Sequence, residues 1–249
     1  MTVTQNITVG VLALQGGVVE HINLLRKAAP ALGSEFSFTF NEVRMPEQLA
    51  KCDALIIPGG ESTTMAIVAR RLGLMDPLKD FVKVQKKPVW GTCAGLVMLA
   101  EQASATKQGG QELIGGLGVR VLRNRYGTQI QSFVASLDLP FLASQSGENG
   151  TGESAASKPF RAVFIRAPVV EEIIVDESAK AEEEAGAAGK KEPVEVLGVC
   201  KDDVVAVRQG NVFGTSFHPE LTDDVRIHVW WLKQVVDSVR HGKLVVQGA

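Results

Sequence analysis

Apolar runs alternate with amphipathic segments through the first hundred residues of the chain. Short runs of mainly apolar residues, typical of buried strands, lie near 7–14, 36–42, 54–57 and 88–91. Segments with helical periodicity follow them near 17–29, 62–71, 74–84 and 94–103. This alternation predicts a parallel sheet with helices on both faces, in which ligands bind at the carboxyl ends of the strands.

The pattern changes after about residue 117. Shorter segments with period-two character lie near 119–122, 130–135 and 162–165, and a final helix is expected over 223–240. We therefore expect a mixed sheet with antiparallel edge strands.

Two inserts interrupt a chain that otherwise has the length and apolar content of one domain, 1–249. The first, 143–158, is small, polar and glycine-rich, which favours a mobile surface loop. The second, 177–192, is rich in Ala, Glu and Lys and is broken by glycines, which favours a transient solvated helix. Neither insert is expected to take part in catalysis.

Cys93 lies between a predicted strand and a predicted helix, with Gly91 and Gly95 on either side. Small neighbours allow a sharp strand-to-helix turn that exposes the side chain, as in a nucleophile elbow. The free N–H groups at the start of the helix favour the thiolate. Taken alone, the motif fits an inert buried cysteine equally well.

His218 and Glu220 lie two residues apart, after a short apolar strand. In an extended chain such residues point to the same side, so imidazole and carboxylate can meet. A cysteine nucleophile needs a base, and the base needs a group that orients it. Alone, this pair would be read as a surface histidine; together with Cys93 it predicts a triad.

A third strand-to-helix turn contains Gly59, Gly60 and Glu61. Glycine lets the backbone approach a ligand closely, and the N–H of Gly60 is a candidate oxyanion donor. Ser62 or Thr63 is expected to cap the following helix, a role compatible with ligand binding in the same turn.

In order, the three motifs resemble those of class I, triad-type glutamine amidotransferases. Within that class the chain resembles the glutaminase subunits of pyridoxal 5'-phosphate synthases, through segments at 11–16, 58–64, 91–95, 123–124, 164–168 and 216–222. It departs from the expected pattern at 126–129 and 132–134, where packing or partner contacts are in question. The resemblance implies a three-layer, flavodoxin-like α/β fold with a mixed, mostly parallel sheet.

The resemblance also implies roles for individual residues. The triad would be Cys93 as nucleophile, His218 as base and acid, and Glu220 as orienting carboxylate, with the amides of Gly60 and Ala94 as oxyanion donors. Residues expected to contact glutamine are Gly60, Glu61, Ser62, Arg123, Ile165 and Arg166. Arginine suits a fixed carboxylate, although an exposed salt bridge is the alternative for each arginine.

The implied function is hydrolysis of L-glutamine to L-glutamate and ammonia through a glutamyl thioester. The ammonia would pass to a synthase subunit of a hetero-oligomeric complex that makes pyridoxal 5'-phosphate (vitamin B6). We also expect glutaminase activity to depend on that partner. The alternatives are a glutaminase of another pathway and, more distantly, a cysteine peptidase or chaperone-like protein with a similar sheet.

The composition of the chain argues against several other classes of protein. A net charge of −2 gives no basic bias toward nucleic acid or anionic membranes. Apolar runs are shorter than a membrane span, and the first residues lack the basic region of a secretory signal, so a cytoplasmic protein is expected. Three cysteines without regular spacing predict neither disulfides nor a metal site, and no cofactor is expected.

Overall fold

The computed structural model of the chain describes residues 5–104, 111–123, 132–145, 158–174 and 192–247. The strands of its main sheet, in chain order, are β1 (Gln5–Leu12), β2 (Phe36–Val43), β3 (Ala54–Ile57), β4 (Val89–Thr92), β5 (Ala100–Ser104), β6 (Leu117–Leu122), β9 (Val169–Ile173), β10 (Glu195–Cys200), β11 (Asp203–Gln209) and β12 (Val212–Thr215). A separate two-stranded ribbon contains β7 (Ser132–Leu137) and β8 (Phe160–Ile165).

The α-helices are α1 (Val18–Ala28), α2 (Pro46–Leu49), α3 (Ser62–Arg71), α4 (Met75–Lys79), α5 (Ala94–Leu99) and α7 (Arg226–Gln247). The other helical turns are the 3-10 turns η1 (Ala29–Leu32), η3 (Pro140–Gln145) and η4 (Pro219–Leu221), and the π-helical turn η2 (Asp80–Val84), which continues α4. Each helix of the described residues is too short or too polar to cross a lipid bilayer.

Neighbouring strands of the main sheet follow the order β2-β1-β3-β4-β12-β11-β9-β6-β5, and β10 pairs with β11. The strands from β2 to β12 in this order are parallel, whereas β12, β11, β9 and β6 pair antiparallel with one another. The last pair, β6 and β5, is again parallel. The predicted α/β fold with a mixed, mostly parallel sheet is confirmed.

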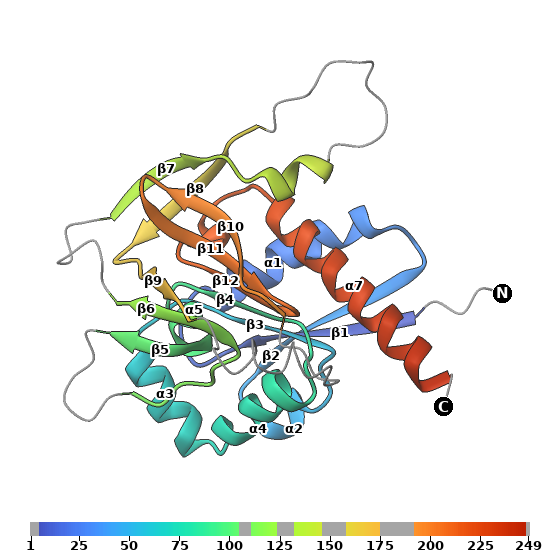
Figure 1. Cartoon of the computed structure of the whole chain (residues 1–249). Helices are drawn as coiled ribbons and strands as arrows, with labels where there is room; N and C mark the ends of the chain where they lie inside the picture. Colours follow the sequence, from blue (N-terminus) through green and yellow to red (C-terminus); the bar gives the residue numbers. More distant parts are fainter. Residues whose placement is uncertain (1–4, 105–110, 124–131, 146–157, 175–191, 248–249) are drawn as a thin grey trace, which may run out of the picture.

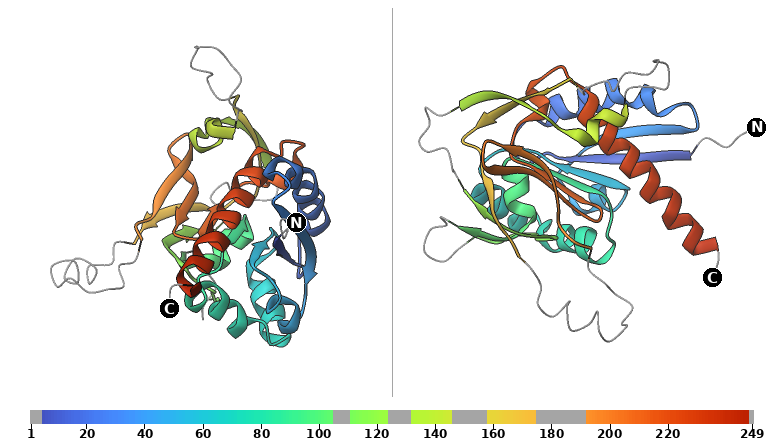
Figure 2. Two further views of the ribbon diagram at one scale, coloured as in Figure 1. Left: turned by 90° about the vertical axis from the view of Figure 1, so that its right-hand side faces the viewer. Right: turned by 45° about the horizontal axis from the view of Figure 1, so that its top comes forward.

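Helices cover both faces of this sheet (Figures 1 and 2). On one side α1 and α7 cover Ile7, Val9 and Val11, and on the other α3, α4 and α5 cover Leu55 and Ile57. Successive strand residues point to opposite faces, so a strand covered on both sides must be apolar throughout. The apolar runs found in the sequence are therefore the central strands of the sheet.

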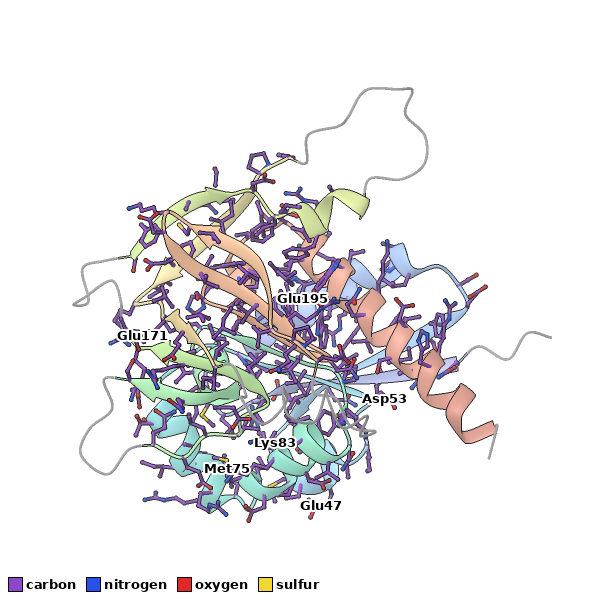
Figure 3. All side chains as sticks on the ribbon, in the orientation of Figure 1. Glu47, Asp53, Met75, Lys83, Glu171 and Glu195 are labelled. Atoms are coloured by element: carbon purple, nitrogen blue, oxygen red, sulfur yellow. The ribbon has the colours of Figure 1, made fainter. Side chains whose placement is uncertain are left out.

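Figure 3 shows side chains both between sheet and helices and on the outer surface, and Met75 of α4 is fully buried in the core on the α3, α4 and α5 side. At the edge of the sheet β2 differs, because its residues alternate between half-buried and exposed until Val43. This alternation is the pattern of a strand covered on one face.

The predicted helix over 94–103 is wrong in its second half. Helix α5 ends at Leu99, Ala100 is extended (φ −67°, ψ 148°), and β5 runs on from there. The apolar run continues through Ala100, so local periodicity does not mark the change. Pairing of Ala100 with Leu117 in the sheet decides the conformation.

Two predicted strands lie outside the main sheet. The segments expected near 130–135 and 162–165 correspond to β7 and β8, which pair only with each other among the described strands. Their apolar side, including Phe160, Ala162 and Phe164, packs into the core on the α1 and α7 side. The ribbon is thus a second layer over that core, where an edge position in the main sheet had been expected.

The predicted inserts fall mainly outside the described residues, which omit 146–157 and 175–191. The departures from the expected motif at 126–129 also lie outside them. The final helix was placed correctly but begins at Arg226, after a loop in which Asp224 accepts a hydrogen bond from the backbone N–H of Arg226.

Candidate active site

The three motifs meet at the carboxyl ends of β3, β4 and β12. These strands are neighbours in the sheet, with Ile57 opposite Gly91 and Thr215 opposite Thr92, so the turns that follow them lie side by side. They border a cavity of about 500 Å³. It is lined by Gln15, Gly16, Gly60, Glu61, Ser62, Cys93, Ala94, Val97, Arg123, Ile165, Arg166, Pro168 and His218.

Cys93 occupies a sharp turn with φ 49° and ψ −106°, an uncommon backbone conformation for a residue with a side chain. Its N–H donates to the carbonyl of Thr215 at 2.8 Å, which ties the turn to β12. A Cβ on Gly95 would lie 1.9 Å from the carbonyl oxygen of Ile57, so only glycine fits there. The close approach of α5 to β3 therefore fixes the elbow that the sequence predicted.

Cys93 lines this cavity and is itself mainly buried. The residue is only 7% exposed, and Sγ lies 3.9 Å from the carbonyl oxygen of Ile165. A Cβ on Gly59 would lie 2.5 Å from Cε1 of His218 and 3.5 Å from Cβ of Cys93. Gly59 therefore allows the 58–60 turn to lie directly against both side chains.

His218 and Glu220 form a direct contact, with Nδ1 and Oε1 2.7 Å apart. The N–H of His218 donates to the carbonyl of Val163 on β8 at 2.8 Å, which fixes the histidine backbone. The sequence predicted this contact from an extended chain, but Glu220 lies in the 3-10 turn η4. The predicted contact between the two side chains is confirmed, but the extended backbone predicted to produce it is wrong.

Each group of this pair stabilises the charged form of the other. Burial by itself would lower the pKa of His218, but hydrogen bonds with Cys93 and Glu220 and the charges of both outweigh burial and raise it to about 10. Burial would raise the pKa of Glu220, yet the hydrogen bond from His218 and the nearby histidines lower it. At neutral pH the pair is therefore an imidazolium hydrogen-bonded to a carboxylate. The imidazolium also forms a hydrogen bond with the side chain of Cys93.

Glu61, and neither Ser62 nor Thr63, caps α3. Its carboxylate accepts from the N–H groups of Thr63 at 3.1 Å and Thr64 at 2.8 Å. Burial would raise the pKa of Glu61, but the hydrogen bonds from Thr64 and Thr63 outweigh it and lower the pKa to about 2. Glu61 is thus an anion at the cavity wall.

Arg123 reaches the same wall from the end of β6. Its Nη2 lies 2.9 Å from Oε1 of Glu61 and 3.2 Å from Oγ1 of Thr63. Ser62 is buried and donates to Oε1 of Gln111 at 3.0 Å. Each of the six residues predicted to contact substrate lines the cavity.

Gln15 is a cavity residue that the sequence interpretation did not single out. It follows β1, and its Oε1 accepts from the N–H of Glu61 at 2.8 Å. A Cβ on Gly60, whose φ is 146°, would lie 2.8 Å from the Gln15 side chain. The sequence signal that could have identified Gln15 was its position just after β1, because β1 neighbours β3 and both strands end at the same edge of the sheet.

Comparison with known proteins identifies the family. Residues 11–237 match the model of the SNO glutamine amidotransferase family. The chain belongs to this family. The matched region runs from β1 into α7 and includes every residue of the cavity lining.

Relatives of this chain align with nearly its whole length. It is 45% identical over 233 residues to the probable pyridoxal 5'-phosphate synthase subunit PDX2 of Arabidopsis thaliana, covering 91% of this chain and 85% of the relative. It is 42% identical to the pyridoxal 5'-phosphate synthase subunit PdxT of Pyrococcus furiosus, covering 92% and 100%. A crystal structure of a glutamine amidotransferase superposes with a TM-score of 0.67 at 37% identity, covering 91% of this chain and 98% of that one.

Proposed function

We propose that this chain is the glutaminase subunit of a pyridoxal 5'-phosphate synthase. It hydrolyses L-glutamine to L-glutamate and ammonia, and a separate synthase subunit consumes the ammonia. The observation that carries the proposal is the meeting of Cys93 and His218 in one cavity, with Glu220 2.7 Å behind the histidine. The names of the relatives support the pathway.

In the first half of the reaction, the thiolate of Cys93 attacks the side-chain amide carbon of glutamine. The C–S bond forms as the carbonyl electron pair moves onto oxygen, and the N–H groups of Gly60 and Ala94 stabilise that oxyanion. When the oxyanion collapses, the C–N bond breaks and His218 protonates the leaving nitrogen, which departs as ammonia. The product is a glutamyl thioester on Cys93.

In the second half, His218 is neutral and removes a proton from water. The resulting hydroxide adds to the thioester carbon, the same two N–H groups stabilise the second oxyanion, and the C–S bond breaks. Glutamate leaves and the cysteine–histidine pair is restored. Glu220 holds Nδ1 of His218 throughout, so that Nε2 faces the reacting atoms.

The outer part of the cavity suits the amino acid end of glutamine. Arg123 and Arg166 offer guanidinium groups to the α-carboxylate, and the ionised Glu61 complements the α-ammonium group. Ser62 and Ile165 complete the wall between these groups and Cys93. Such a pocket recognises a free amino acid, and this favours a glutaminase over a peptidase.

The deciding experiment is ammonia release from glutamine by the wild type and by Cys93→Ala, each alone and mixed with a synthase subunit of pyridoxal 5'-phosphate synthase. We expect wild-type activity that rises with the partner. In the variant we expect a loss of about 10⁶-fold, the scale seen when a triad nucleophile is removed.

Cys52→Ala is the matched control, because Cys52 is a buried cysteine away from the cavity. Wild-type activity that ignores the synthase subunit would place the glutaminase in another pathway. Activity that survives in Cys93→Ala would remove Cys93 from the mechanism.

A further inference from the structure

Two buried histidines lie behind the carboxylate of Glu220. His21 of α1 and His228 of α7 are both 0% exposed, and Nδ1 of His21 lies 3.1 Å from Nε2 of His228. Nε2 of His21 lies 3.4 Å from Oε2 of Glu220. Neither histidine belongs to a motif singled out in the sequence, but the structure places both in line with the triad.

The start of α1 is shaped around this carboxylate. A Cβ on Gly17 would lie 2.7 Å from Cγ of Glu220, so the chain passes directly over the side chain. The N–H of His21 donates to the carbonyl of Gly17 at 3.0 Å, which links the position of the histidine to that contact. Trp90 packs edge-on against both imidazoles, with ring centroids 5.6 and 5.0 Å away.

Both imidazoles are neutral at physiological pH. Burial lowers the pKa of His21 to about 3, even though the charge of Glu220 acts in the opposite direction, and burial lowers the pKa of His228 to about 3. A neutral imidazole carries one N–H and one acceptor nitrogen. The contact between the rings therefore uses one donor and one acceptor, and two arrangements are possible.

In the first arrangement, Nδ1–H of His21 donates to His228. The lone pair of His21 Nε2 then points at the ionised Glu220, and His228 keeps an N–H at Nδ1. That atom is buried and has no hydrogen-bond partner among the described residues. This arrangement sets an acceptor against a carboxylate and leaves a buried donor unpaired, and both are unfavourable.

In the second arrangement, Nε2–H of His228 donates to Nδ1 of His21, and Nε2–H of His21 points at Oε2 of Glu220. Within the described part of the chain Oε2 is buried and has no hydrogen-bond partner, and Nε2 of His21, 3.4 Å away, is the nitrogen that faces it. The hydroxyl of Thr92 forms a hydrogen bond of 3.4 Å with the same nitrogen, so in this arrangement the N–H is shared between Thr92 Oγ1 and Oε2 of Glu220. Only a lone pair of His228 remains unpaired.

We propose that His21 is a positioning residue of the triad, whose Nε2–H holds Oε2 of Glu220 while His228 fixes the His21 tautomer. His218 engages Oε1, so a second donor on Oε2 keeps the carboxylate from rotating and keeps Nε2 of His218 directed at Cys93. The catalytic consequence rests on the proposed glutaminase function, but the tautomers do not.

The tautomers are tested by long-range ¹H–¹⁵N NMR of the full chain labelled with ¹⁵N-histidine, with resonances assigned through single-histidine variants. We expect both His21 and His228 as neutral Nε2–H imidazoles at pH 7. A proton on Nδ1 of His21, or a charged His21, would overturn the proposal. This measurement needs no turnover, so it stands even if the chain proves not to hydrolyse glutamine.

The catalytic consequence is tested with His21→Leu and His21→Gln in the glutaminase assay. Leucine removes the donor, and we expect kcat to fall about tenfold to a hundredfold with KM within about twofold, the range for one hydrogen bond to a charged group. The side chain of glutamine offers an NH₂ group as donor and a carbonyl oxygen as acceptor, so His21→Gln should recover most of kcat.

His241→Leu is the matched control, because His241 is exposed and its ring contacts the carbonyl of Asp237 on the same helix, far from Glu220 in the sequence. Wild-type kcat in His21→Leu, or equal losses in the Leu and Gln variants, would contradict the positioning role. If His21→Leu does not fold, the Gln variant and the NMR tautomers still decide the question.

Discussion

The cavity is built from two regions that differ in burial. The parallel strands β3, β4 and β12 end in the turns that carry Gly60, Cys93 and His218, and Cys93 and Glu220 are only 7% and 6% exposed. The second region, β6 and the ribbon strand β8, contributes Arg123 and Ile165, and Ile165 is 38% exposed. The reacting groups are thus enclosed, whereas Ile165 and the side chain of Glu61, 43% exposed, make the proposed substrate side more open.

The difference shows how the two tasks are divided. Groups that react must be held in one geometry before substrate arrives, and close packing with strained backbone at Cys93 does so. Groups that select substrate must let it enter. Arg123 is already paired with Glu61 at 2.9 Å, so glutamine would join an existing pair.

Of the effects that separate the two regions, the largest is expected in the enclosed region. Glu220→Gln keeps the shape of the side chain but removes the charge that orients His218, and we expect kcat to fall by about 10³-fold to 10⁴-fold, as when a triad carboxylate becomes an amide. Glutamine turnover measured against Glu47→Gln, an exposed carboxylate on α2, checks this. A loss confined to KM would show that Glu220 serves binding, and the division between the two regions would then fail.

A smaller effect is expected in the open region. Arg123→Ala removes a guanidinium proposed to bind the α-carboxylate, and we expect KM for glutamine to rise about 10-fold to 100-fold with kcat changed far less. Arg120→Ala is the matched control, because Arg120 lies on β6 just before Arg123 and pairs with Gln102 and Glu172 outside the cavity. Equal KM values in the two variants would refute the assignment.

The enclosed region is the part of the site that the sequence could predict. The turns at Gly60, Cys93 and His218 follow short apolar strands, so local patterns place them at one edge of a parallel sheet. The strand β5 was missed because Ala100 continues an apolar run and only its pairing with Leu117 makes it extended. Local patterns identify elements, but pairing between distant segments decides their partners.

Contacts between side chains in the core could not be predicted from the sequence, because they too depend on which distant segments come together. His21 and His228 are 207 positions apart and meet only because α1 and α7 cover one face of the sheet. Their periodicity indicated helices correctly, but it gave no sign that both imidazoles lie in line with Glu220. Gln15 was missed similarly, since its contact with Glu61 depends on the neighbouring positions of β1 and β3.

The smallest expected effects are changes in stability with pH, and the two regions should lose stability at opposite extremes. The pKa of His218 is raised to about 10, so its contribution to the free energy of unfolding is complete below the usual value of 6.5 and disappears as pH rises toward 10. The pKa of Glu61 is lowered to about 2 from 4.5, so its contribution is present above 4.5 and disappears as pH falls toward 2.

Urea unfolding of the wild type, His218→Gln and Glu61→Gln between pH 3 and pH 10 separates these contributions. His218→Gln should flatten the decline in stability on the alkaline side alone, and Glu61→Gln should flatten the decline on the acid side alone. The Glu61 effect should be the weaker, because that side chain is 43% exposed and solvent screens its charge. If His218→Gln changed both sides equally, the enclosed triad and the open wall would have to be treated as one coupled unit.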